Sequence, residues 1–193
     1  MKRILLAMML TGCSITPRVF DNVEYDYAVR MTIDSTRAIH RCDSPDRWQY
    51  VQALNTDSLI LQEYVVRKDE SDMVRRMALE VRKMTLEVLD RPLPSQQFCV
   101  LKLTNIQASS RILSKVLGNA QASMCDGGLV SRLDQFTKAY KQGQIAEDEY
   151  KELVSDMESL RLINKLGCSA TELEQMHEDL ELLEKVLPSV LSL

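Results

Sequence analysis

The stretch from Asp46 to Leu89 reads DRWQYVQALNTDSLILQEYVVRKDESDMVRRMALEVRKMTLEVL. Its apolar residues recur mainly at steps of three and four, which is the spacing of one face of an amphipathic helix. The polar run Arg67–Asp72 interrupts this series once. Two structures fit: one continuous helix of about 44 residues, a length that suits a coiled coil, or two helices that fold back at Arg67–Asp72. The absence of Gly and Pro favours the continuous helix, but both alternatives stay open.

Helical periodicity continues on both sides of this stretch, and turn residues divide it. The expected helices cover 20–41, 46–89, 96–124, 129–140 and 145–166, and a last helical unit carries a leucine stripe up to Pro188. Ser44 is expected to cap the second helix, with Pro45 at its first position. We therefore predict an all-α fold: an elongated helical bundle with long antiparallel helices and a C-terminal helical hairpin. Helix content should exceed about 60%, with essentially no sheet.

Composition limits the classes of function. The chain has 193 residues, of which 45% are apolar and 27% charged, and its net charge is −4. This length is sufficient for a proper hydrophobic core. An acidic chain without a block of Lys and Arg is a poor nucleic-acid binder and has no electrostatic grip on anionic lipids. We expect no nucleic-acid partner.

The first 13 residues, MKRILLAMMLTGC, have the parts of a secretory signal. A basic start precedes a short apolar run and a pair of small residues. The run is too short to span a bilayer, which needs about 20 residues. The tetrad Leu10–Cys13 resembles the lipobox of bacterial lipoproteins. That resemblance implies cleavage between Gly12 and Cys13, with diacylglycerol on the Cys13 thiol and an acyl chain such as palmitate on the new amine.

This resemblance gives the chain an expected order and address. Residues 1–12 are the cleaved signal peptide, 13–19 a lipidated tether, and 20–193 a helical periplasmic domain. Several acyl chains satisfy the two-signal requirement for stable anchoring. Ser14 after the cysteine, in place of Asp, resembles the sorting pattern for the outer membrane, so we expect the periplasmic face of that membrane. The tether Ser14–Val19 would reach at most about 20 Å.

Four further cysteines fit an oxidising compartment, where two disulfides can persist. Cys99 and Cys125 bracket one expected helix and would lie roughly 39 Å apart, too far for a disulfide. Two connectivities therefore remain open: Cys42–Cys99 with Cys125–Cys168, or Cys42–Cys125 with Cys99–Cys168. A hairpin between Cys125 and Cys168 returns the chain to its starting end, so these two are expected to pair. The first connectivity is thus favoured, and its Cys42–Cys99 bridge requires that the chain folds back at Arg67–Asp72. Free, buried thiols are the alternative.

A second resemblance covers 129–157. Gly143 and Ile145, followed by acidic residues and Tyr150, are similar to the short helical hairpin family called SHOCT. That family implies a hairpin used in oligomerisation and no chemistry. Ala146 departs from the family pattern because it cannot cap a helix. An ordinary acidic helix start that complements the macrodipole explains the same residues.

No catalytic, metal or cofactor motif is present in the sequence, which lacks a phosphate loop, His-Glu-x-x-His and Gly-x-Ser-x-Gly. His40 and Cys42 form a conceivable pair of metal ligands, but no spacing supplies the other two. Met73, Met77 and Met84 share a helix face and are expected in the core, although such stripes also form adaptable binding surfaces. We expect no enzyme activity, no cofactor and no metal.

Three functions remain open from the sequence. The favoured one is a membrane-anchored, non-enzymatic interaction or envelope-structural lipoprotein with a protein partner in the envelope, or a homo-oligomer. A phage spanin subunit and a superinfection-exclusion lipoprotein are concrete versions, and no residue selects either one or decides between bacterial and phage origin. A periplasmic enzyme with a dispersed carboxylate site would show carboxylates converging on a pocket. A carrier of an apolar ligand would show a dry cavity between the helices.

Overall fold

A computed structural model describes residues 21–68, 70–91, 94–118 and 128–191. These ranges hold eight helices and no strand, and helices account for 85% of them. The helices are α1 (Asn22–Ile39), α2 (Arg47–Arg67), α3 (Asp72–Asp90), α4 (Gln96–Leu117), α5 (Leu129–Lys141), α6 (Glu147–Gly167), α7 (Ala170–Gln175) and α8 (His177–Leu191). The prediction of an all-α bundle is confirmed.

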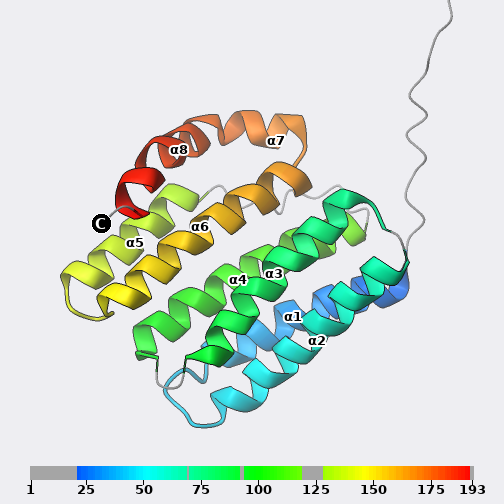
Figure 1. The fold of residues 1–193 in the computed structure, drawn as a ribbon, viewed down its shortest axis with the longest axis horizontal. Helices are drawn as coiled ribbons and strands as arrows, with labels where there is room; N and C mark the ends of the chain where they lie inside the picture. Colours follow the sequence, from blue (N-terminus) through cyan, green and yellow to red (C-terminus); the bar gives the residue numbers. More distant parts are fainter. Residues whose placement is uncertain (1–20, 69, 92–93, 119–127, 192–193) are drawn as a thin grey trace, which may run out of the picture.

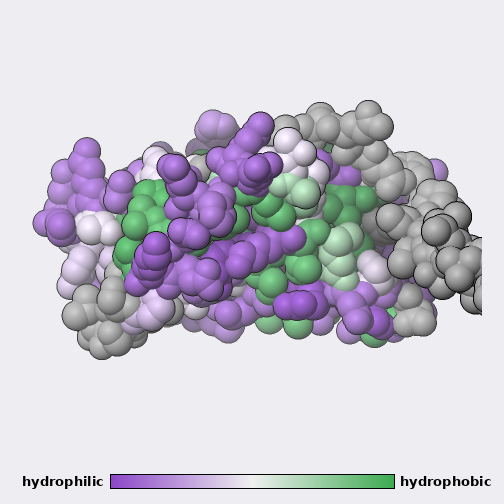
Figure 2. All heavy atoms as spheres, turned by 90° about the horizontal axis from the view of Figure 1, so that it is seen from above, coloured by the Kyte–Doolittle hydropathy of each residue, from purple (hydrophilic) through white to green (hydrophobic). Residues whose placement is uncertain are grey.

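The bundle is built in layers, which Figure 1 shows in sequence colours. Helices α1 to α4 form an antiparallel four-helix bundle, in which α1 packs on α4 and α2 packs on both α1 and α3. Helix α6 lies on the side of this bundle formed by α3 and α4. Helices α5 and α8 then pack on α6, so α6 is covered on several sides. The face that carries α7 and α8 is mostly hydrophilic, with smaller hydrophobic areas (Figure 2).

The stretch 46–89 folds back on itself, so the continuous helix is wrong. Helix α2 ends at Arg67, and α3 begins with Ser71 as its N-cap, whose hydroxyl accepts a hydrogen bond from the Val74 amide at 3.4 Å. Serine before an aspartate is a helix-start signal, and it replaces the Gly or Pro that a break often needs. Folding back lets both apolar stripes pack against α1 and α4, whereas a single helix would leave half of its stripe exposed.

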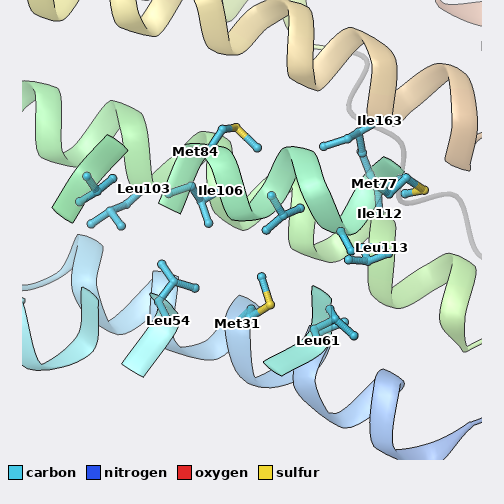
Figure 3. Packing of buried hydrophobic residues seen from close by; sticks show 14 of the residues in the cluster. Met31, Leu54, Leu61, Met77, Met84, Leu103, Ile106, Ile112, Leu113 and Ile163 are labelled. Atoms are coloured by element: carbon cyan, nitrogen blue, oxygen red, sulfur yellow. The ribbon is translucent and has the colours of Figure 1, made fainter. Parts of the chain in front are cut away.

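Two hydrophobic cores result. The first core joins α1 to α4, with Ile163 from α6, and Figure 3 shows Met31, Leu54 and Leu61 pointing from α1 and α2 toward α3 and α4. Met77 and Met84 are completely buried, and Met73 is partly buried against them, so the methionine stripe belongs to the core as predicted. The second core joins α5 to α8 and includes Phe98, Leu101 and Ala108 from α4. Helix α4 therefore belongs to both cores.

The disulfide Cys42–Cys99 is present, with a Cα–Cα distance of 5.8 Å. It joins the turn after α1 to the first turn of α4, and both cysteines are buried. The bridge expected between Cys42 and Cys99 is therefore confirmed, and so is the fold-back of the chain at Arg67–Asp72 on which it depends. Cys168 is also disulfide-bonded. Its expected partner, Cys125, lies outside the described residues, so that pairing stays a prediction.

Other expectations need correction or lie outside the described ranges. Helix α2 begins at Arg47 and not at Pro45, and the Ser44 hydroxyl accepts a hydrogen bond from the Asp46 amide at 3.2 Å. The last unit comprises two helices, and α8 continues through Pro188 to Leu191. The signal peptide 1–12, the tether 13–19 and the lipobox Leu10–Cys13 lie outside the described residues. None of the described helices combines the length and hydropathy of a membrane span.

Candidate functional site

The most unusual local chemistry is a buried lysine between the two cores. Lys102 lies on α4 with a completely buried side chain. Helix α4 is buried on nearly all sides, because α1 and α3 cover one part of it and α6 another. A lysine on such a helix cannot reach water, and a buried charge is tolerated only with charged partners.

Three carboxylates surround the ammonium group. Lys102 Nζ donates to Asp156 Oδ1 at 2.7 Å and to Glu87 Oε2 at 2.5 Å, and it lies 3.1 Å from Glu152 Oε1. Asn105 Nδ2 donates to the second oxygen of Asp156 at 3.1 Å. Glu87 lies on α3, whereas Glu152 and Asp156 lie one turn apart on α6. The lysine therefore ties three helices together. We call these five residues the Lys102 cluster.

Arg91 extends the cluster toward the surface. Its guanidinium donates to Asp148 Oδ2 at 2.6 Å and to Glu152 Oε2 at 2.7 Å. The same group lies 4.8 Å from the centre of the Phe98 ring, within the range of a cation–π contact. Glu152 thus bridges Arg91 and Lys102. This shared carboxylate joins the buried lysine and the partly exposed arginine into one hydrogen-bonded network.

The surroundings shift the pKa of both buried groups. Burial opposes the charge on Lys102, but Asp156, Glu152 and Glu87 together raise its pKa above the usual value. Burial raises the pKa of Asp156 to about 6, although Lys102 and Asn105 oppose that shift. The lysine is therefore permanently charged, while Asp156 can take up a proton in mildly acidic solution.

A cleft of about 350 Å³ opens beside the cluster and is lined by Glu87, Asp90, Arg91 and Glu152. This arrangement meets in part the condition for an enzyme, because carboxylates converge on a surface cavity. However, Glu87 and Glu152 already accept bonds from Lys102 and Arg91. Both carboxylates are thus occupied by cations of the same chain, so the arrangement favours holding helices together over general base catalysis.

Further polar contacts run along the same boundary between α1–α4 and α5–α8. Lys115 on α4 binds Glu172 at 2.7 Å, and the Ser159 hydroxyl on α6 donates to Glu80 on α3 at 2.6 Å. Glu149 accepts from the amide of Ser95 at 2.7 Å and also from its hydroxyl. With one exception, Glu80, the carboxylates of these three contacts come from α6 or α7. The boundary between the two cores is thus held by carboxylates that accept from a lysine, a backbone amide and serine hydroxyls.

The sequence analysis did not select Lys102 or Asp156. A signal for both exists, because Lys102 is a lone charge in the apolar run Phe98–Leu103 and Asp156 lies within the apolar stripe of α6. The sequence cannot show that the two positions meet. His40 is the C-cap residue of α1, whereas His177 is the first residue of α8 and pairs with Glu181 at 3.1 Å. Over the described ranges, no group of three or more His, Cys, Asp and Glu side chains could hold a metal ion.

Compared with known proteins, the chain matches no family model, no curated sequence and no solved structure. Its function must therefore be argued from its own residues.

Proposed function

We propose that this chain is a lipoprotein, anchored by lipid on Cys13 to the periplasmic face of the outer membrane, whose helical body acts by binding a protein and not by catalysis. The buried disulfide Cys42–Cys99 carries the part of this proposal that concerns export, because such bonds persist in oxidising compartments and are rare in the cytosol. The charge, apolar run and small-residue pair before Cys13 supply the signal.

The start of the described chain suits a short tether. Asp21 caps α1 by accepting a hydrogen bond from the Val23 amide at 2.8 Å. The same carboxylate binds Lys68 and accepts from the Tyr64 hydroxyl at 3.2 Å. Asp21, two residues after the end of the tether, is thus fixed to the end of the bundle where α2 ends. The tether Ser14–Val19 would span at most about 20 Å, so this end of the body would lie near the membrane.

A binding role agrees with the Lys102 cluster. Its charged groups are occupied by one another and lie between two hydrophobic cores. Such networks fix how helices align, at some cost in stability. We propose that the cluster is architectural, and that any partner binds on the outer helix faces.

The test of the anchor uses cells that express the chain in the presence of a palmitate analogue. Wild-type protein should be labelled and should fractionate with membranes, and Cys13→Ser should be unlabelled and released. Cys42→Ser with Cys99→Ser is the matched control, since it removes two other thiols and should keep the label. An unlabelled wild-type protein would refute the proposal.

A further inference from the structure

The outer face of α2 and α3 combines exposed apolar side chains with an arginine that lacks a carboxylate partner. Arg82 on α3 reaches α2, where it donates to the Asn55 carbonyl at 3.1 Å, to the Asn55 side chain and to Ser58 Oγ at 3.3 Å. All three acceptors are neutral. Among the described residues no carboxylate pairs with Arg82, and its partial burial lowers its pKa by desolvation. An incoming carboxylate would therefore gain a cation that this chain leaves uncompensated.

Helical spacing places apolar residues around this contact. Leu79 and Leu86 lie three and four residues from Arg82, on the same side of α3. Leu59 lies four residues from Asn55 on α2, and Val66 lies seven further. All four are exposed, at 50%, 39%, 41% and 53% respectively. Helix α2 contacts α1 and α3, while α3 contacts α2, α4 and α6, so no other described helix packs extensively on the outer side of the pair (Figure 1).

We infer that this face, defined by Leu59, Glu63, Val66, Leu79, Arg82 and Leu86, is the interface with a second copy of the chain. The face is self-complementary about a two-fold axis. The Arg82–Asn55 and Arg82–Ser58 contacts put Leu59 and Leu79 at one level of the antiparallel pair. At a rise of about 1.5 Å per residue, Glu63 lies about 6 Å from this level, and Arg82 lies about 4.5 Å away in the opposite direction.

The exposed residues Val66 and Leu86 follow the same two-fold relation. Val66 and Leu86 lie about 10 Å from the level of Leu59 and Leu79, again in opposite directions. A two-fold axis across the helices at that level therefore brings Val66 level with the second copy's Leu86, and Glu63 level with its Arg82. Glu63 is exposed, and its contact with Arg67 on its own chain is long, at 3.9 Å. The acid that Arg82 lacks is thus supplied by the second copy.

Other features of the face agree with a protein interface. Two other arginines border this face and each lies near a carboxylate of its own chain: Arg75 is 2.6 Å from Asp72, and Arg67 is 3.9 Å from Glu63. Interface cores are depleted of charge, and contiguous exposed apolar residues mark contact sites. This inference names the partner for the proposed binding role. It does not require the anchor, because labelling of Cys13 and self-association can succeed or fail independently.

The test is sedimentation equilibrium of the full chain, purified from whichever cell fraction contains it, in a neutral detergent at matched density. The expected species is a dimer. Leu79→Glu and Glu63→Arg should each raise the dissociation constant by about tenfold or more. Combining Glu63→Arg with Arg82→Glu should recover much of that loss, because the pair is exchanged between copies. Leu182→Glu, which alters an exposed leucine on α8, is the matched control and should leave association unchanged.

Several outcomes would overturn the inference: a monomer at every concentration, a dimer unaffected by Leu79→Glu, or open-ended oligomers, which a two-fold contact cannot form. Circular dichroism of each variant checks that the helices persist. If Arg82→Glu unfolds the α2–α3 pair, Glu63→Arg with Leu79→Glu still decide the matter, because both positions are exposed.

Discussion

Replacement of Lys102 by Met should destabilise the protein strongly, because it leaves Asp156 buried without its cation. Removing one partner of a buried ion pair typically costs about 3–5 kcal/mol. The packing loss is small, since Met is close to Lys in length and is apolar. Urea unfolding at pH 7.5, with the disulfides intact, should therefore show a free energy of unfolding lower by about that amount.

The pKa of Asp156 determines how the loss of stability in Lys102→Met depends on pH. In the folded protein the pKa of Asp156 is raised to about 6 from its ordinary value of 3.8. A raised carboxyl pKa penalises folding above pH 6, and the penalty disappears as pH falls toward 4. Lys102→Met removes the cation that opposes the shift, so its deficit should be largest at pH 7.5 and smaller at pH 5.

A second substitution separates charge from packing. Lys102→Met combined with Asp156→Leu removes both charges, and it should recover most of the lost stability, because apolar replacements of buried ion pairs are often neutral. Lys151→Met, on the exposed side of α6 and paired with Glu147, should change stability by less than about 0.5 kcal/mol. The reasoning is refuted if the double variant is no more stable than Lys102→Met, or if Lys102→Met itself costs under about 1 kcal/mol.

Two further predictions concern the disulfides. Cys42→Ala with Cys99→Ala should lower the free energy of unfolding by about 4 kcal/mol, since the bridge spans 57 residues in the sequence; urea unfolding measures this, and a loss below 1 kcal/mol would contradict the entropic argument. Non-reducing peptide mapping should find one peptide that links Cys125 to Cys168, and a link from Cys99 to Cys125 would contradict the helix that separates them.

The helices were predictable because each leaves a local signature. The helices expected over 129–140 and 145–166, and the turns at Arg91–Ser95 and Lys141–Gln144, lie within a few residues of the observed boundaries. The helix expected over 96–124 begins at Gln96 as predicted, but it ends earlier than predicted, at Leu117, with Gly118 as its C-cap. The helix boundaries predicted from the sequence were wrong where packing between helices, and not the local residues, determines where a helix ends. The break at Arg67–Asp72 lacks Gly and Pro, and it forms because two short apolar stripes must pack on α1 and α4. The Ser71–Asp72 start was the local sign of it.

The Lys102 cluster could not be predicted in the same way, because its members lie on three helices. Glu87 and Asp156 are separated by 69 positions, and only the packing of α3 and α6 on α4 brings them together. Its position explains why α4 can belong to two cores. An apolar contact between the halves would allow α6 to slide or rotate on α4, since leucine and valine side chains fit many alignments. A lysine that must meet Glu87, Glu152 and Asp156 at once, without water, permits one alignment. The buried charges therefore set the register between the halves, and the two hydrophobic cores supply the stability that offsets their desolvation.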